Sequence, residues 1–313
     1  MRKQVILGFD TSNYTTSCAV CDINGTILAN YKLLLPVKEG ERGLRQSDAV
    51  FAHIKNLQKI ALQIKNDHSD YDIVSIGYSA YPRDAEGSYM PCFLVGESVS
   101  MVISALYNID AYKFSHQNGH IEASLYSSGA NISGDFIAFH VSGGTTEIVY
   151  VNNCDNENKI SIIGGSSDLH FGQAIDRIGV KMGLPFPSGR YIEALASENT
   201  KEIPNSKICV NGYNCNISGL ENLSLKLYER TEDKALTSAF VLDFVSKTLI
   251  SLTKNLRKKY NTPIVYAGGV MSNKIIQNNL KNTFKDVYFA EPEFSSDNAS
   301  GVALLALKKY KRS

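Results

Sequence analysis

The chain has 313 residues, of which 32 are basic and 31 acidic, so its net charge is +1. A chain of this length exceeds the usual size of one hydrophobic core, which predicts two domains or one duplicated domain. The balanced charge excludes binding to nucleic acid or a membrane through the overall field of the protein, so a basic surface for such a partner must be local.

The amino-terminal residues and the cysteines indicate the compartment. The apolar run after Arg2 and Lys3 is too short for a secretory signal, because Gly8 and Asp10 interrupt it. No stretch of the sequence comes close to a membrane span. Six cysteines in a long chain of this kind predict reduced thiols in the cytoplasm. The pair in Cys18-Ala19-Val20-Cys21 lies in a predicted strand, where residues three apart face opposite sides, so it is not a chelating pair.

Two segments of the chain repeat the same order of strands and turns. Residues 4–31 alternate apolar runs with the polar turn 10–16 and with Asn24-Gly25, which predicts a three-stranded meander. Residues 135–163 follow the same plan, with the turn Ser142-Gly143-Gly144-Thr145-Thr146 between the first two strands. This repeat indicates a duplicated nucleotide-binding lobe whose polar turns face phosphates.

Helical patterns and short apolar strands follow each predicted meander. Their alternation predicts the α/β class, with a sheet whose strands are joined by helical crossovers. Helices are expected at 46–67, 96–108, 172–183, 235–260 and 298–309, and strands at 73–78 and 264–267.

The segment His116-Gln117-Asn118-Gly119-His120 carries two imidazoles that can lie on one helical face and hold a metal ion. A polar helix surface is the alternative interpretation. Asp297 is the best candidate for a third ligand, although it would serve equally well as the N-cap of the last helix. A zinc peptidase of the His-Glu-x-x-His kind needs glutamate where this chain has Gln117, which argues against peptide hydrolysis.

Glycine-bearing turns follow several predicted strands, where open α/β sheets bind ligands. Together they favour a nucleotide cleft, because glycine lets backbone N–H groups approach an anion closely. Asp176 lies on an apolar helix, where either ribose hydroxyls or an ion pair with Arg177 or Lys181 would satisfy its carboxylate. The glycine-bearing turns are Ser142-Gly143-Gly144, Pro187-Ser188-Gly189 and Gly268–Asn273, and the polar turn Asp10-Thr11-Ser12, which has no glycine of its own, follows the first strand in the same way.

Seven motifs in order resemble those of the tRNA N6-adenosine threonylcarbamoyltransferase family, whose transferase subunit was formerly called O-sialoglycoprotein endopeptidase. The resemblance covers nearly the whole chain, and seven matches in order are highly specific. The matching segments are Gly8–Ser12, His116–Glu122, Val141–Thr146, Gly172–Arg177, Gly183–Gly189, Ala267–Asn273 and Asp297–Ser300.

The resemblance implies the actin-like ATPase fold of sugar kinases, Hsp70 and actin, with two duplicated lobes and a central cleft. The first lobe would comprise residues 1–130 with the C-terminal helix 298–313, and the second residues 131–297. The resemblance also implies one divalent metal ion, iron or zinc, bound by His116, His120 and Asp297, with Asp10 as a candidate catalytic residue. ATP, ADP or threonylcarbamoyl-AMP would be bound by His140, Val141, Ser142, Gly143, Gly144, Asp176, Gly189, Glu193 and Asn273.

In the family, the threonylcarbamoyl group of threonylcarbamoyl-AMP passes to N6 of adenosine 37 in tRNAs that read ANN codons. The resemblance therefore implies tRNA and the partner subunits of a synthase complex as partners, with a lobe-to-lobe dimer as one possible arrangement, and no membrane partner.

The chain departs from the family pattern at three places. Asn13, Tyr14 and Thr15 stand where the family usually has more acidic residues, residues 81–87 replace a Gly-Pro-Gly segment, and Glu221 replaces a lysine. These departures indicate a divergent paralogue. The other functions left open are a non-catalytic nucleotide-binding scaffold, a related carbamoyltransferase, and a sugar or acid kinase of the same fold.

Overall fold

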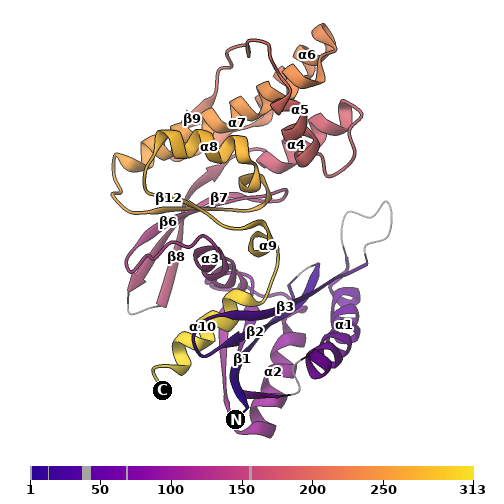
Figure 1. Cartoon of the computed structure of the whole chain (residues 1–313), viewed down its shortest axis with the longest axis vertical. Coiled ribbons are helices and arrows are strands. Elements are labelled where there is room, and N and C mark those ends of the chain that lie inside the picture. The colour runs from indigo at the N-terminus through magenta and orange to yellow at the C-terminus, as the bar shows by residue number, and fades with distance from the viewer. Residues whose placement is uncertain (1, 13, 37–43, 68–69, 155–156) are drawn as a thin grey trace. The chain divides into compact units, whose positions relative to one another are not determined.

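The computed structural model describes residues 2–12, 14–36, 44–67, 70–154 and 157–313 (Figure 1). Asn13, one of the departures from the family pattern, lies outside the described residues. The chain forms two compact units, Met1–Tyr126 with Phe294–Ser313, and Ser127–Glu293. The lobe boundaries expected at residues 130 and 297 stay a prediction.

The first unit is built on a five-stranded sheet with the order β3-β2-β1-β4-β5. The first three strands form the expected antiparallel meander, and β4 and β5 continue the sheet parallel to β1. The strands are β1 (Lys3–Asp10), β2 (Thr15–Asp22), β3 (Ile27–Leu34), β4 (Tyr71–Tyr81) and β5 (Asp110–Ser115). The helices are α1 (Gln46–Asp67), α2 (Phe93–Tyr107), α3 (His116–Ser127) and α10 (Ser300–Tyr310).

The second unit repeats this topology within a larger sheet of order β12-β11-β6-β7-β8-β10-β9. The part of this sheet with the order β8-β7-β6-β11-β12 has the same meander and the same two parallel strands as the first sheet. The duplicated α/β frame predicted from the repeat is therefore confirmed. The strands are β6 (Phe136–Val141), β7 (Thr146–Cys154), β8 (Glu157–Ser166), β9 (Cys209–Asn211), β10 (Asn214–Asn216), β11 (Ile264–Ala267) and β12 (Val287–Phe289).

Helix α7 (Lys234–Arg257) runs through the hydrophobic core of the second unit. By length and composition it could cross a membrane, so the expectation that no stretch comes close to a span is wrong on that count. However, 72% of its most apolar window is buried inside the protein, as in the core helix of a soluble domain. The other helices of this unit are α4 (Phe171–Lys181), α5 (Gly189–Ser197), α6 (Ser218–Thr231), η1 (Gly269–Ser272) and α8 (Lys274–Thr283), and the short α9 (Pro292–Ser295) follows.

Helix α10 packs closely on the first sheet because two strands present glycine to it. A Cβ atom on Gly8 of β1 would lie 2.4 Å from the carbonyl oxygen of Ala299, and one on Gly77 of β4 would lie 2.2 Å from that of Val302. On the same sheet, Cys18 and Cys21 of β2 are buried in different apolar clusters. The prediction that they face opposite sides is confirmed.

A buried histidine in the first unit predicts a loss of stability in acid. His53 of α1 is fully buried, and its Nδ1 lies 2.8 Å from the hydroxyl of Thr16. Burial lowers the pKa of His53 to about 4, although Asp10 acts in the opposite direction. The unfolded chain takes up this proton near pH 6.5, so the free energy of unfolding should fall as the pH drops from about 6.5 to about 4, by at most about 3 kcal/mol.

Urea unfolding of the wild type and of His53→Gln at neutral and acidic pH measures this contribution. The variant should lose stability less steeply with acid than the wild type. Equal slopes for the two proteins would show that His53 does not carry the effect.

Candidate metal centre

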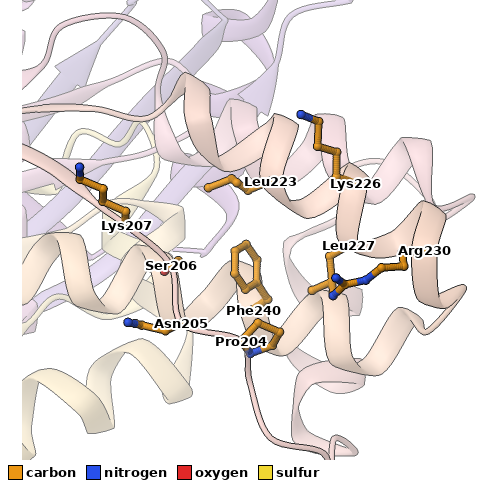
Figure 2. A pocket seen from close by; sticks show the side chains of 9 residues that line it. All are labelled: Pro204, Asn205, Ser206, Lys207, Leu223, Lys226, Leu227, Arg230 and Phe240. Atoms are coloured by element: carbon orange, nitrogen blue, oxygen red, sulfur yellow. The ribbon is translucent and has the colours of Figure 1, made fainter.

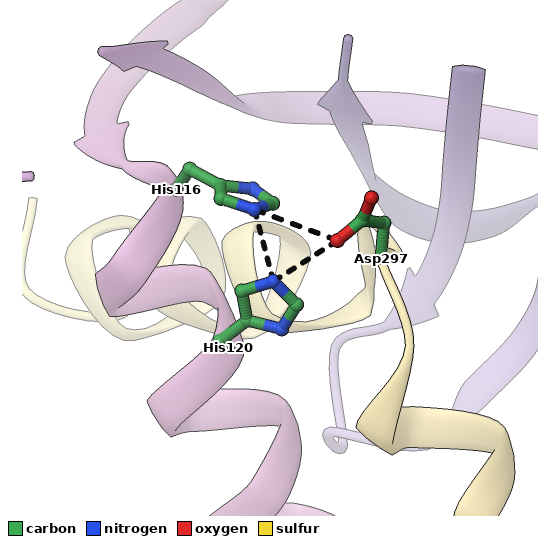
Figure 3. Close-up of side chains that lie close together, drawn as sticks. All are labelled: His116, His120 and Asp297. Atoms are coloured by element: carbon green, nitrogen blue, oxygen red, sulfur yellow. Dashed lines mark hydrogen bonds and ion pairs between the residues drawn. The ribbon is translucent and has the colours of Figure 1, made fainter. Parts of the chain in front are cut away.

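Two histidine side chains lie together at the start of α3. The helix begins at His116, directly after β5 ends at Ser115, so His116 and His120 are one turn apart. Their Nε2 atoms are 2.9 Å apart, and the two rings meet edge to face (Figure 3). The predicted shared helical face is therefore present.

Asp297 reaches this pair from the segment before α10. Its Oδ1 lies 3.2 Å from Nε2 of His120 and 3.6 Å from Nε2 of His116 (Figure 3). The interpretation of Asp297 as a helix N-cap is wrong, because α10 begins only at Ser300 and the amide of Ser300 donates to the side chain of Asn298. The carboxylate of Asp297 faces the imidazoles instead.

The three donor atoms fit one metal ion in their chemistry and spacing. A tetrahedral ion bound at about 2.1 Å holds its ligand atoms about 3.4 Å apart, close to the three separations observed. Two imidazole nitrogens and one carboxylate oxygen suit zinc and iron alike. These residues form a cluster of three potential ligand atoms within 4.8 Å of one another, and metal binding by them remains a prediction.

Asp10 contacts Nδ1 of His116, the ring nitrogen that does not face the other two side chains of the cluster. Its Oδ2 is 2.7 Å from Nδ1 of His116, and it also accepts a hydrogen bond from the hydroxyl of Ser79. The amide of Ser12 donates to the other carboxylate oxygen at 2.9 Å. A carboxylate in this position holds a proton on Nδ1, so Nε2 is the nitrogen that would bind a metal, in exchange for its own proton.

The ionised carboxylates give the cluster a negative environment. Burial alone would lower the pKa of His116, but Asp10 and then Asp297 outweigh it and raise that pKa to about 10. Burial acts to raise the pKa of Asp297, yet His116 and His120 hold it well below its usual range. Burial also acts to raise the pKa of Asp10, but His116 and the hydrogen bonds outweigh it and lower that pKa. A cation is favoured between such groups.

Two glycines allow α10, which follows Asp297, to pack closely against α3, which carries the histidines. This packing role was not predicted from the sequence. A Cβ atom on Gly301 of α10 would lie 1.8 Å from the carbonyl oxygen of Gly119, which stands between the two histidines in α3. The helices can cross this closely because Gly301 has no side chain, and a Cβ atom on Gly119 would lie 3.1 Å from Cγ1 of Val302. Nothing in the sequence around Gly119 indicates that this residue packs against Gly301.

The segment that replaces the family's Gly-Pro-Gly holds the start of α3. The carboxylate of Asp84 accepts hydrogen bonds from the Ser115 hydroxyl at 2.9 Å and from the Asn118 side chain at 2.5 Å. The carbonyl of Pro82 accepts the amide of Gln117 at 3.1 Å. This departure from the family pattern therefore supplies structural contacts next to His116.

The predicted nucleotide residues from His140 to Gly144 lie at the carboxyl end of β6 in the second unit. The amide of Ser142 closes the turn on the carbonyl of Thr145 at 2.8 Å, and the Ser142 carbonyl accepts the amide of Gly172. A Cβ atom on Gly172 would lie 2.7 Å from Gly143. A Cβ atom on Gly268 would likewise clash with the backbone of Val141, and the φ of Gly268 is +100°. The structure thus gathers three predicted glycine-bearing segments around one strand end.

The remaining predicted nucleotide residues lie on the helices that follow. Asp176 of α4 accepts the amide of Ser188 at 2.7 Å, directly before Gly189 opens α5, and burial raises the pKa of Asp176. It forms no ion pair with Arg177, which pairs with Glu221 at 3.4 Å. The carboxylate of Glu193 accepts the amide of Lys274 at 2.6 Å.

The last of these residues, Asn273, caps a helix. Its side chain accepts the amide of Ile276 and forms the N-cap of α8. A short 3₁₀ turn over Gly269–Ser272 precedes this helix, and α8 begins at Lys274. Asn273 and Glu193 together satisfy backbone amides at this helix start.

Replacing Asp10 by asparagine should weaken metal binding by about 10- to 100-fold, because His116 loses the carboxylate that fixes its tautomer. Competition with a chromophoric chelator for zinc measures the affinity. Asp22→Asn is the matched control, since Asp22 is another buried aspartate of the first sheet and lies outside the cluster. Unchanged affinity in Asp10→Asn would refute a positioning role for this carboxylate.

The fold and the cluster define a class: an α/β protein of the actin-like ATPase fold that carries a candidate two-histidine, one-aspartate metal centre in its first unit. The profile of the tRNA N6-adenosine threonylcarbamoyltransferase family matches residues 41–304. The chain belongs to this family.

Curated relatives carry the same family name. The chain is 26% identical to the tRNA N6-adenosine threonylcarbamoyltransferase of Francisella tularensis subsp. holarctica strain LVS, with 98% of this chain and 94% of the relative covered. It is 27% identical to that of Streptococcus suis strain 05ZYH33, with 100% and 94% covered.

Solved structures support the fold. Component A of the (R)-2-hydroxyglutaryl-CoA dehydratase of Acidaminococcus fermentans superimposes with a TM-score of 0.56 at 15% identity, with 98% and 99% of the two chains covered. A ROK family glucokinase of Streptomyces griseus superimposes with a TM-score of 0.51 at 13% identity, with 96% and 98% covered. At these identities the likeness shows the actin-like ATPase fold alone.

Proposed function

We propose that this chain transfers the threonylcarbamoyl group of threonylcarbamoyl-AMP to N6 of adenosine 37 in tRNA, and that it does so with a bound metal ion. Membership of the family supports modification of a tRNA adenosine. The single observation that carries the metal dependence is the convergence of His116, His120 and Asp297, with Asp10 bonded to the far nitrogen of His116.

The residues of the chain divide into three roles in this proposal. His116, His120 and Asp297 hold the ion, and Asp10 keeps the His116 ring in its metal-binding tautomer and orientation. A bound iron or zinc ion would supply Lewis-acid stabilisation of charge on the threonylcarbamoyl carbonyl oxygen. The nucleotide is bound by His140, Val141, Ser142, Gly143, Gly144, Asp176, Gly189, Glu193 and Asn273.

Peptide hydrolysis has no support in the arrangement of α3. Gln117 occupies the place of the peptidase glutamate, and its backbone N–H donates to the carbonyl oxygen of Pro82. Glu122, the acidic residue that follows the second histidine, is buried and pairs with Lys308 at 2.7 Å. The carboxylate of Glu122 is therefore engaged in holding α10 on α3.

We place the reaction in the cytoplasm, with ANN-decoding tRNA as substrate and partner subunits of a synthase complex bound to the chain, in an assembly that includes a lobe-to-lobe dimer. An exposed apolar surface on α2 supports a protein partner. Its side chains at Met101, Val102, Leu106 and Tyr107 are each at least half exposed. An apolar group of this kind on one helix is typical of a protein interface.

Modified-nucleoside analysis by mass spectrometry tests the function. The gene is supplied to a strain depleted of its own transferase subunit, and the tRNA nucleosides are quantified. Recovery of N6-threonylcarbamoyladenosine by the wild type is expected. Failure to recover it, even when partner subunits of the same source are supplied, would refute the proposal.

A further inference from the structure

A groove in the second unit lies between α6 and the segment before β9, away from every residue assigned above. Its volume is about 510 Å³, and α7 contributes Phe240 to its floor (Figure 2). The apolar lining consists of Phe240 with Pro204, Leu223 and Leu227. Leu223 is 41% exposed, so part of this floor is open to solvent.

Three cations surround the groove, and none of its nine lining residues is acidic. Lys207 stands on one wall, and Lys226 and Arg230 stand one turn apart on α6 (Figure 2). All three side chains are exposed. In the part of the chain that the structure describes, none of the three forms an ion pair, in contrast to Arg177, Lys201 and Lys247 of the same unit.

A hydroxyl in the groove also lacks a partner. Ser206 lies between the lining residues Asn205 and Lys207, and only 9% of its surface is exposed. Its Oγ is buried and makes no hydrogen bond with any described residue. Because an unsatisfied buried hydroxyl costs free energy, a ligand that offers an acceptor or donor here would be favoured.

We propose that this groove binds an acidic amphipathic segment of a partner protein. Its apolar side chains would cover Leu223 and Pro204, the two apolar lining residues that are not buried, its carboxylates would pair with Lys207, Lys226 and Arg230, and its backbone would bond to Ser206. An RNA backbone fits less well: the floor is apolar, and its aromatic ring, Phe240, is too deeply buried to stack on a base. The proposal is independent of the transfer reaction.

Selection from a random library of short peptides on the wild-type protein tests the chemistry. Peptides that combine Asp or Glu with Leu, Ile or Phe should be enriched, and a synthetic member should lose affinity by about tenfold or more with Lys226→Glu combined with Arg230→Glu. Lys226→Arg combined with Arg230→Lys should retain the affinity. Lys181→Glu combined with Lys285→Glu is the matched control, because it makes the same charge change on exposed lysines of this unit outside the groove.

Two results would overturn the proposal. One is the enrichment of no acidic amphipathic peptide, or of peptides that bind the charge-reversed and control variants equally well. The other is a loss of tRNA binding in the charge-reversed variant with no effect on peptide, which would make the groove an RNA contact. Neither result depends on whether the wild type transfers threonylcarbamoyl, so failure here is distinguishable from failure of the proposed function.

Discussion

Replacing His116 by alanine is expected to lower threonylcarbamoyl transfer to tRNA by at least about a hundredfold. The substitution removes one of the two imidazole donors and leaves Asp10 without the ring that neutralises its charge. Charge stabilisation by a bound metal is worth several kcal/mol, and each 1.36 kcal/mol is about a factor of ten in rate. Loss of the ion therefore predicts an effect of this size or larger.

The assay measures N6-threonylcarbamoyladenosine formed on tRNA by the purified chain with its partner subunits. Gln117→Ala is the matched control: Gln117 follows His116 on the same helix, and its contact with Pro82 is made by the backbone amide. The control should keep the wild-type rate. A His116→Ala protein that folds and transfers at the wild-type rate would remove the metal from the proposed mechanism.

Replacing Gly301 by alanine is expected to destabilise the first unit by about 3 kcal/mol and to weaken metal binding at the same time. The new Cβ would lie 1.8 Å from the carbonyl oxygen of Gly119, a backbone atom that cannot move aside alone. Overpacking of this kind usually costs about 1–3 kcal/mol, and a clash between two helix backbones lies at the upper end. Separation of α10 from α3 would also draw Asp297 away from the histidines.

Urea unfolding and zinc competition measure the two effects on the same samples. Gly219→Ala is the control: Gly219 lies in helix α6, and a Cβ there meets nothing within 4 Å. It should be stabilising by about 0.5–1 kcal/mol, since alanine loses less backbone entropy in a helix. Equal stability of Gly301→Ala and the wild type would show that the helices have another way to pack.

Local patterns in the sequence predict much of the fold. Helix α1 occupies 46–67 and strand β11 occupies 264–267, as expected, because apolar periodicity indicates the helix, and Pro263 and Gly268 flank the strand. The repeated meander anticipates the duplicated sheet. Predicted ends are less accurate where the helix start depends on a neighbour. Helix α10 begins at Ser300 rather than Asn298: Ala299 is its N-cap residue, the Asn298 side chain accepts the amide of Ser300, and Asp297 turns to the histidines.

The candidate site shows the same division between local and tertiary information. The pairing of His116 with His120 follows from helical spacing alone, and the structure adds Asp297 to them as expected. The position of Asp10 behind His116 depends on how β1 and β5 lie in one sheet with β4 between them. Likewise, Gly119 and Gly301 are 182 positions apart in sequence, and only the docked helix reveals why both are glycine.

Metal analysis of the purified protein shows whether His116, His120 and Asp297 bind an ion. The wild type and a His116→Ala/His120→Ala variant are prepared side by side and their bound metals are quantified by inductively coupled plasma mass spectrometry. We expect about one iron or zinc ion per wild-type chain and none in the variant. A wild type that binds no metal, or a variant that keeps a full complement, would contradict the assignment of His116, His120 and Asp297 as a metal centre.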